Sequence, residues 1–302
     1  MTGRTKIAVI NMTMAGLCFA FMGVLVKLSS QKLPFLVAVF FRTFVGFLML
    51  LPYVLRLGLL SGIVQHRLLF LRSLFGYLAL TMFFYALEKL PLSNAVVLNF
   101  SSPVFVVPLS FILLKERKSF SVFLFVLVAF VGAGLLVAPD FSAINVNAVI
   151  GLLSAFFAAL AYVTVRTLSR TEKSIVIVFF FTAYGSLFAF LTLVIVFAFG
   201  GFSGMDYKSC VDVLGQPIHL SFLCGIGITA TLGQVFLTKA YSIERASVVA
   251  VFSYLNPLLS YILGLVLFNE HPTISNILGG ALVLGGCLGV AFSARESLKP
   301  EA

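Results

Sequence analysis

Ten apolar segments, separated by short polar turns, dominate this sequence and restrict the fold more than any other feature. Each is long enough, or nearly so, to cross the roughly 30 Å hydrocarbon layer of a membrane as an α-helix. The segments are 7–27, 34–55, 68–87, 92–114, 120–138, 148–168, 174–199, 219–241, 246–268 and 274–293. The short turns between them predict that neighbouring helices pack as antiparallel hairpins. The pattern predicts an all-α membrane protein with ten transmembrane helices.

Composition supports this prediction and excludes other classes. Of the 302 residues, 61% are hydrophobic and only 10% are charged, whereas soluble domains carry roughly a quarter charged residues. A membrane β-barrel would show alternating polar and apolar residues, which this sequence does not. We expect the first segment to be a retained span rather than a cleaved signal peptide, because its apolar run is long and many spans follow.

An internal repeat organises the ten segments. At a constant offset of 154, the stretch from 83 to 116 matches the stretch from 237 to 270. Both stretches contain a proline near the middle of a span and end on a glutamate. The matched pairs are Ala86 with Ala240, Ser93 with Ser247, Val97 with Val251, Pro103 with Pro257, Leu109 with Leu263, Leu113 with Leu267 and Glu116 with Glu270. The chain therefore reads as an internal duplication.

A second match places the boundary between the two copies. Gly16, Ala20, Phe21 and Leu25 align with Gly151, Ala155, Phe156 and Leu160 at an offset of 135. The difference between the offsets indicates an insertion in the second copy, at 200–217. We assign the first five-helix repeat to 1–140 and the second to 141–302. Five spans per copy invert the second repeat, as in many alternating-access transporters.

Basic residues predict the orientation. Of the 20 Lys and Arg, Arg42 is interpreted as the only charged residue well inside a span. Just four of the others fall on one side: Lys27, Lys32, Lys89 and Lys208. The remaining fifteen (20 − 1 − 4), Arg72 among them, fall on the side that also holds both termini. This asymmetry predicts cytoplasmic termini and accounts for the net charge of +10 without a nucleic-acid partner.

Polar residues gather where the two mid-span prolines interrupt their helices. Asn99 and Ser102 lie beside Pro103, and Tyr254 and Asn256 beside Pro257. Prolines leave carbonyls without helical partners, and polar groups at membrane depth must face protein or water. We predict a substrate site at the interface of the repeats. The alternative is that these side chains satisfy the freed carbonyls of kinked helices.

Arg42 is the strongest single candidate for substrate binding. It lies about eight residues, or roughly 12 Å at 1.5 Å per residue, from the outer end of its span. A guanidinium there binds a substrate carboxylate or phosphate, or else caps backbone carbonyls of a neighbouring helix. Gln234 and Tyr254 are the predicted inner counterpart. Tyr85, Tyr162 and Tyr184 are further cavity candidates, with anchoring at the membrane interface as the alternative.

The last span of each copy is rich in small residues, which allow close approach between helices. These residues are Ala129, Gly132, Ala133 and Gly134 in the fifth span, and Gly279, Gly280, Ala281, Gly285, Gly286 and Gly289 in the tenth. Packing within one molecule and a homodimer contact both explain the pattern.

Enzyme motifs, metal-ligand spacing and phosphate-binding loops are absent from the sequence, so we expect no catalytic residue, metal or cofactor. All ten acidic residues and the histidines are at span ends or in loops. The expected partners are a small-molecule substrate and the lipid bilayer. Because no carboxylate or histidine lies in the predicted path, exchange or uniport is favoured over proton coupling.

Several segments resemble the EamA-type branch of the drug/metabolite transporter superfamily. The resemblance covers nearly the whole chain, with Glu244-Arg245 as a departure from the family pattern. It is carried by Arg72-Ser-Leu-Phe-Gly76, Phe84-Tyr85-Ala86-Leu87, Leu90-Pro91-Leu92, Ala95, Ser102-Pro103, Glu116, Leu237-Thr-Lys-Ala-Tyr241, Ala246-Ser247, Tyr254, Pro257, Glu270, Gly279 and Gly286. It implies metabolite transport in a bacterial inner membrane, through a cavity lined by the first four helices of each half. The second half is most similar to the subgroup with S-adenosylmethionine carriers.

The sequence thus predicts a secondary transporter of a small polar metabolite, an amino acid or a related compound such as S-adenosylmethionine. Arg42 is the predicted carboxylate anchor. Efflux of hydrophobic drugs or toxic metabolites is the alternative within transport, and it makes Arg42 structural. A lipid-head-group flippase subunit or a structural membrane partner are the alternatives from other classes.

Overall fold

The computed structural model describes residues 3–29, 35–90, 92–116, 119–137, 146–199, 215–268 and 273–296, and every element among them is a helix. The helices are α1 (Gly3–Ser29), α2 (Phe35–Arg56), α3 (His66–Lys89), α4 (Leu92–Asn99), α5 (Ser102–Leu113), α6 (Phe120–Val137), α7 (Val146–Leu168), α8 (Ser174–Ala198), α10 (Pro217–Ile243), α11 (Ala246–Val251), the 3-10 turn η1 (Phe252–Tyr254), α12 (Leu255–Phe268) and α13 (Ile274–Glu296). Much of the predicted insertion, together with Pro91 and Glu270, lies outside the described residues.

The predicted apolar segments all correspond to helices, with ends within a few residues of those expected. In the described part of the chain, nine segments are long and apolar enough to cross a membrane, and Phe120–Leu135 is a shorter apolar helix. The fourth and ninth segments are each built from two helices, α4 with α5 and α11 with α12. The protein is therefore an all-helical, multi-pass membrane protein.

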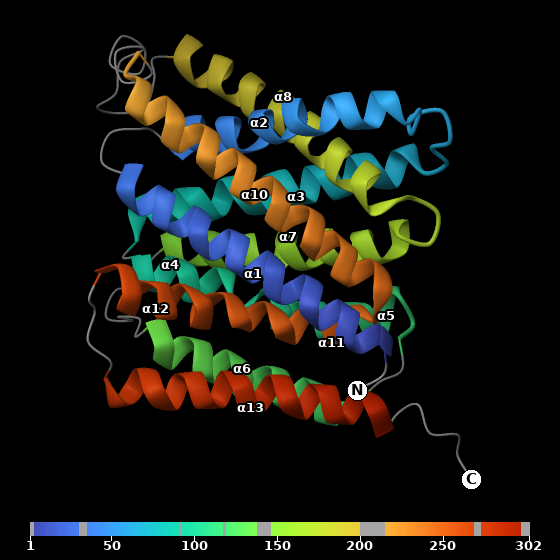
Figure 1. The fold of residues 1–302 in the computed structure, drawn as a ribbon, viewed down its shortest axis with the longest axis vertical. Coiled ribbons are helices and arrows are strands. Elements are labelled where there is room, and N and C mark those ends of the chain that lie inside the picture. The colour runs from blue at the N-terminus through green and yellow to red at the C-terminus, as the bar shows by residue number, and fades with distance from the viewer. Residues whose placement is uncertain are drawn as a thin grey trace.

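The helices lie side by side in one bundle (Figure 1). In that view α6 and α13 form a pair along one edge, α2 and α8 lie at the opposite edge, and α1, α3, α7 and α10 fill the middle. Contacts are most extensive within the pairs α6–α13, α1–α10, α3–α7 and α2–α8. The start of α1 and the end of α13 lie at the same end of the bundle.

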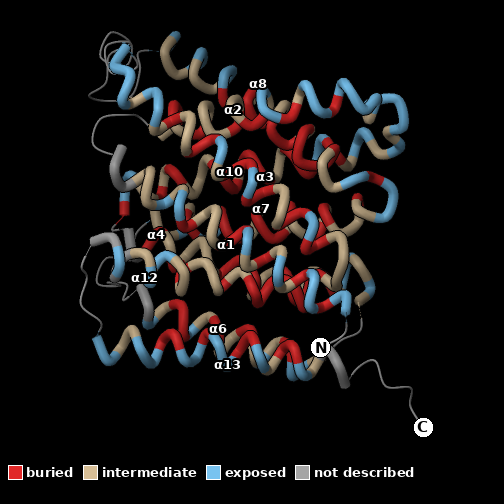
Figure 2. Tube along the Cα trace, in the orientation of Figure 1, coloured by how far each residue is buried: buried red, intermediate tan, exposed pale blue. Residues whose placement is uncertain are grey.

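Burial follows the contacts between helices, and the outward faces stay exposed (Figure 2). The largest buried cluster joins α1, α5, α6, α7, α10, α11 and α13. Large apolar side chains such as Ile112, Phe190 and Phe292 are exposed on the bundle surface. In a membrane these side chains contact lipid, so helix association depends on close packing more than on hydrophobic burial.

The pair α6–α13 is packed through its small residues. A Cβ atom added at Gly286 would lie 2.7 Å from the Phe125 carbonyl oxygen and from the Ala129 side chain. One at Gly132 would lie 2.7 Å from the carbonyl oxygen of Gly279. Gly285 has no such neighbour. Several of the small residues therefore pack within the molecule, while a homodimer contact through the outward face stays a prediction.

Both helices with a mid-span proline are interrupted. The α4 helix ends at Asn99, and α5 begins at Ser102 with Pro103 in its first turn. In the second half, α11 ends at Val251 and the 3-10 turn η1 leads into α12, whose first turn contains Pro257. Because proline lacks an amide hydrogen, it fits the first turn of a helix, where no carbonyl partner is available.

Candidate functional site

A small cavity lies between α2, α8 and α10. Its volume is about 10 Å³, close to the smallest space that holds one water molecule. It is lined by Arg42, Thr43, Phe181, Thr182, Ala230, Thr231 and Gln234. In this conformation a metabolite does not fit, so any substrate bound here requires the helices or side chains around it to move.

The threonine hydroxyl groups that line the cavity each donate a hydrogen bond to a backbone carbonyl of their own helix. The Thr43 hydroxyl donates to the carbonyls of Val39 and Phe40, each at 3.0 Å. Thr231 Oγ1 donates to the Gly227 carbonyl at 2.7 Å, and Thr182 Oγ1 donates to its own helix at 2.9 Å. The Arg42 guanidinium and the Gln234 amide therefore supply the remaining side-chain donors of this lining.

A second arginine lies inside the bundle, which corrects the sequence prediction. Arg72 was expected on the cytoplasmic surface, with Arg42 as the only charged residue well inside a span. Instead, Arg72 is 1% exposed in the interior of α3, and its Nε has no hydrogen-bond partner among the described residues. Its guanidinium carbon lies 4.2 Å from the centroid of the Phe181 ring. Phe181 also lines the cavity, so the ring lies at the boundary between Arg72 and that space.

Neither guanidinium is paired with a carboxylate in the described part of the chain. The carboxylates whose side chains are described all contact other groups: Glu88, Glu116, Glu172 and Glu244. A charged side chain in the membrane interior costs at least about 2.5–3.5 kcal/mol. A cation–π contact returns about 0.5–2 kcal/mol. The ring of Phe181 therefore offsets only part of the cost of burying Arg72.

Tyr162 lies within electrostatic range of both arginines. Its hydroxyl, on α7, lies close enough to both Arg42 and Arg72 to interact with them electrostatically. Its ring stacks on Tyr241 of α10, with centroids 5.2 Å apart and planes 16° from parallel. Tyr85, Tyr162 and Tyr184 were the further cavity candidates from the sequence, and Tyr162 is the one that interacts with Arg42 and Arg72.

The residues at the helix interruptions lie away from this cavity. Asn99 Nδ2 donates to Ser154 Oγ of α7 at 3.4 Å, and Ser102 is buried. Tyr254 is fully buried beside Phe100 and Phe130. Asn256 Oδ1 accepts from Ser260 at 3.3 Å. Of the predicted substrate-binding residues, the structure brings together Arg42 and Gln234.

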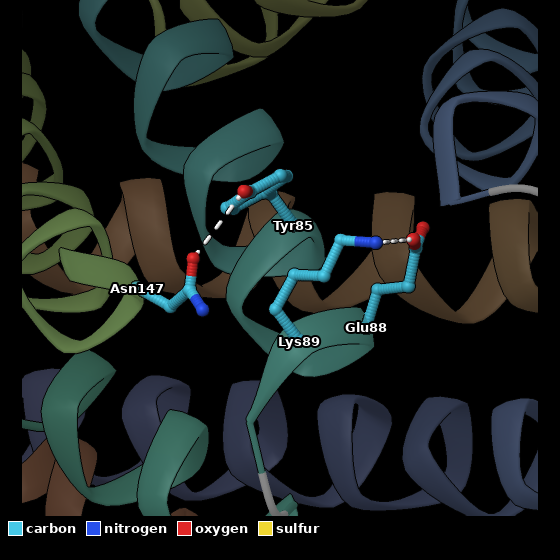
Figure 3. A network of polar contacts seen from close by, with 4 residues as sticks. All are labelled: Tyr85, Glu88, Lys89 and Asn147. Carbon is cyan, nitrogen blue, oxygen red and sulfur yellow. Dashed lines mark hydrogen bonds and ion pairs between the residues drawn. The ribbon is translucent and has the colours of Figure 1, made fainter. Parts of the chain in front are cut away.

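Tyr85 lies in the last turns of α3, at the end of the bundle away from the start of α1 (Figure 1). Its hydroxyl donates to Asn147 Oδ1 of α7 at 3.3 Å, and the Lys89 ammonium points to Glu88 of its own helix at 2.8 Å (Figure 3). The Tyr85–Asn147 contact links the two sequence halves at this end. It lies outside the lining of the cavity.

At the other end of the bundle, carboxylates accept hydrogen bonds across the halves, from backbone amides and from one hydroxyl group. Glu116, after α5, accepts from the amides of Ala246 and Ser247 at the start of α11, at 2.8 and 3.1 Å. Glu172 accepts from the amides before α3, and Glu244 from Thr5 Oγ1 of α1 at 2.7 Å. These bonds join the two sequence halves at this end of the bundle.

The order of these helices and their sequences match a known family. The profile of the EamA-like transporter family matches residues 6–138 and again residues 147–292. The chain belongs to the EamA-like transporter family. The resemblance noted in the sequence is thereby confirmed, and the EamA-like chain is a membrane transporter.

Individual relatives agree with this assignment. The chain is 34% identical to the pseudopaline exporter CntI of Pseudomonas aeruginosa (strain UCBPP-PA14), over 95% of this chain and 96% of the relative. It is 24% identical to an S-adenosylmethionine uptake transporter of Rickettsia prowazekii, over 86% and 83% of the two chains. A solved crystal structure shares the fold, with a TM-score of 0.74 at 20% identity and coverage of 97% and 99%.

For this EamA-like chain, sequence reasoning missed Arg72 and the threonines of the cavity. Arg72 is the seventh residue of α3, so its position alone fits a side chain that extends to the membrane interface. A signal was present in Gly76, one turn later. A Cβ there would collide with the Arg72 guanidinium and lie 2.6 Å from the Phe181 ring. In this chain the glycine four residues after Arg72 leaves the space that the Arg72 side chain occupies.

Proposed function

We propose that this protein is a secondary transporter that moves a small, carboxylate-bearing metabolite by alternating access, with Arg42 as the anchor of the carboxylate. The observation that carries the proposal is the position of Arg42 on the lining of the cavity between α2, α8 and α10, which the Gln234 amide also lines, without a carboxylate partner in the described chain. A guanidinium and an amide are donors that suit a carboxylate in a water-poor site. Ionisable groups inside the membrane mark substrate pathways.

The pairing of helices supports inverted repeats and alternating access. In the predicted repeat, each span of the first half corresponds to the span five places later in the chain. When every span is replaced by its counterpart, the pair α1–α10 becomes the pair α7–α3, and the pair α3–α7 becomes α10–α1. The pairs α2–α8 and α6–α13 are each exchanged into themselves. Two halves that pack in this exchangeable way can swap their conformations, which closes one side and opens the other.

We further propose an inner-membrane location with both termini in the cytoplasm. The start of α1 and the end of α13 lie at the same end of the bundle (Figure 1). The basic residues Arg56, Arg166 and Arg170 lie at that end too. Positive charge next to membrane spans is retained on the cytoplasmic side.

The relatives favour a metabolite as substrate and leave the direction open. One is named as an exporter of pseudopaline and another as an uptake transporter for S-adenosylmethionine. On this basis the proposal names a carboxylate-bearing metabolite rather than a particular compound. Efflux of hydrophobic compounds and lipid-head-group flipping are the outcomes that the experiment must separate from it.

The test is uptake by purified protein in proteoliposomes. A radiolabelled panel of amino acids and S-adenosylmethionine is offered with and without the same unlabelled compound inside. We expect Arg42→Gln to reduce uptake by at least ten-fold, because a charge-assisted hydrogen bond contributes about 1.5–3 kcal/mol. The matched control is Arg56→Gln, the same change at the exposed end of the same helix, which should leave uptake nearly unchanged.

Two outcomes would contradict the proposal. Normal uptake by Arg42→Gln would remove Arg42 from the site. No uptake of any panel member by folded wild-type protein would instead point to efflux of hydrophobic compounds or to lipid flipping. Assays with a fluorescent hydrophobic dye and with a labelled lipid then separate these two functions.

A further inference from the structure

The described interior holds two positive charges and no negative one to match them. Arg42 lies on α2 and Arg72 on α3, and Tyr162 interacts electrostatically with both. The described carboxylates lie at the ends of helices or in turns and contact other groups. Tyr162 is neutral when protonated, so it does not compensate the charge.

A purely structural role does not account for Arg72. Its Nε lacks a hydrogen-bond partner among the described residues although the side chain is almost completely buried. Buried guanidinium groups normally direct their donors at carboxylates or carbonyls. Arg166, by comparison, donates to the carbonyls of Tyr241 and Ser242 at 3.3 and 2.8 Å. The unmatched donor of Arg72 fits a partner that is not part of the protein.

Phe181 separates Arg72 from the cavity in this conformation. Its ring covers the Arg72 guanidinium and lines the space that also contains Arg42. The cavity must enlarge to admit any substrate, because its volume is about 10 Å³. Rotation of this one ring would both enlarge it and uncover the second guanidinium.

From these observations we infer that the substrate carries two anionic groups, one bound by Arg42 and the other by Arg72 after the Phe181 ring moves aside. The inference rests on the proposed transport function and adds the substrate class. A dianion in this site neutralises both guanidiniums, whereas a monoanion leaves one of them unpaired. The preference for a dianion therefore arises at Arg72, and general affinity for carboxylates arises at Arg42.

The test compares ligands that differ by one charge and little else. Purified protein in detergent is heated with glutamate or glutamine, and with succinate or succinamate, at constant ionic strength. Ligands that bind the folded state raise the unfolding temperature, and a tighter ligand does so at a lower concentration. For wild-type protein we expect glutamate and succinate, which carry two carboxylates, to act at concentrations at least ten-fold lower than glutamine and succinamate, which carry one.

The variants assign this preference to a residue. Arg72→Gln should abolish the difference between dianion and monoanion while the response to the monoanion remains. Arg72→Lys should restore part of the difference because it keeps the charge. Arg42→Gln should weaken the response to all these ligands. Arg166→Gln, the matched control, should lower stability without changing the preference, since Arg166 bonds backbone carbonyls.

Several results would overturn the inference. They are equal responses of wild-type protein to dianion and monoanion, no response to any dianion, or a preference that persists in Arg72→Gln. If Arg72→Gln does not fold, a preference in Arg72→Lys equal to or stronger than that of the wild type also contradicts it. Transport of amino acids with a single carboxylate that depends on Arg42 but not on Arg72 would leave the proposed function intact and remove this inference alone.

Discussion

Glu116 accepts a hydrogen bond from the Ser247 hydroxyl at 2.6 Å, and its two oxygens also accept from the amides of Ala246 and Ser247. The carboxylate that ends the first-half broken helix therefore caps the start of the corresponding helix in the second half. Carboxylates at a helix N-terminus bind amides that have no partner within the helix. This contact ties the halves together at one end of the bundle.

Removal of the Glu116 carboxylate should destabilise the folded protein at the start of α11. For Glu116→Ala we expect a loss of about 1–3 kcal/mol in unfolding free energy, because buried amide donors at the start of α11 lose their acceptor. Thermal unfolding in detergent measures the change. Glu88→Ala, which removes a carboxylate paired with exposed Lys89 at the other end, should cause little change. Equal losses of unfolding free energy in the two variants would show that the hydrogen bonds of Glu116 to α11 contribute no extra stability.

The same substitution should make the cavity more accessible from the end of the bundle where Glu116 lies. A cysteine introduced as Gln234→Cys, in a variant without native cysteines, reports on this accessibility. We expect Glu116→Ala to increase its labelling rate by a membrane-impermeant thiol reagent in inside-out vesicles. An unchanged rate would mean that other contacts control this end.

Neighbouring glycines of α13 should respond oppositely to alanine. A Cβ at Gly286 would lie 2.7 Å from the Phe125 carbonyl and from Ala129, whereas one at Gly285 meets nothing within 4 Å. We expect Gly286→Ala to destabilise the protein by about 1–3 kcal/mol through overpacking. Gly285→Ala should be neutral or slightly stabilising, because alanine favours helix. Thermal unfolding of both variants checks this, and similar losses would contradict the α6–α13 packing.

Tyr254 offers a test between packing and substrate binding. Its hydroxyl is buried without a hydrogen-bond partner in the described structure, although the sequence predicted a role in the substrate site. If the side chain only packs, Tyr254→Phe should keep uptake normal and leave stability equal or higher, since an unsatisfied hydroxyl is removed. A loss of uptake with normal stability would place Tyr254 on the transport path in another conformation.

The orientation is tested with single cysteines at exposed turns. Ser61, between α2 and α3, lies at the basic end, and Gln216, before α10, lies at the opposite end. After replacement of the four native cysteines, Gln216→Cys should react with an impermeant thiol reagent in intact cells. Ser61→Cys should react only after the cells are permeabilised. The opposite pattern would reverse the proposed topology.

The ten segments and the interruptions at Pro103 and Pro257 were readable in the sequence because they depend on local chemistry. An apolar run of membrane length forms a helix whatever lies around it, since lipid offers no other partner for backbone groups. A proline interrupts a helix through its own ring and missing amide. Arg42 and Gln234 were both predicted to bind substrate, but as outer and inner counterparts, and only the structure places them on the lining of one cavity.

Other features depended on the rotation and pairing of helices, which the sequence does not specify directly. Tyr254 and Asn99 share a depth with the cavity, yet their helices turn them toward aromatic packing and toward Ser154. Arg72 has the sequence position of an interfacial cation, and only the approach of Phe181 from α8 shows that it points inward.

The sequence by itself therefore determined that this chain crosses the membrane many times and belongs among the EamA-like transporters. Those properties follow from hydrophobic length and local pattern. Only the tertiary structure decided that the Arg42 and Arg72 guanidiniums lie on either side of Phe181 inside the bundle, without a carboxylate partner among the described residues. The physical reason is that charge compensation in a membrane depends on which side chains meet across helices, and helices distant in the sequence supply them.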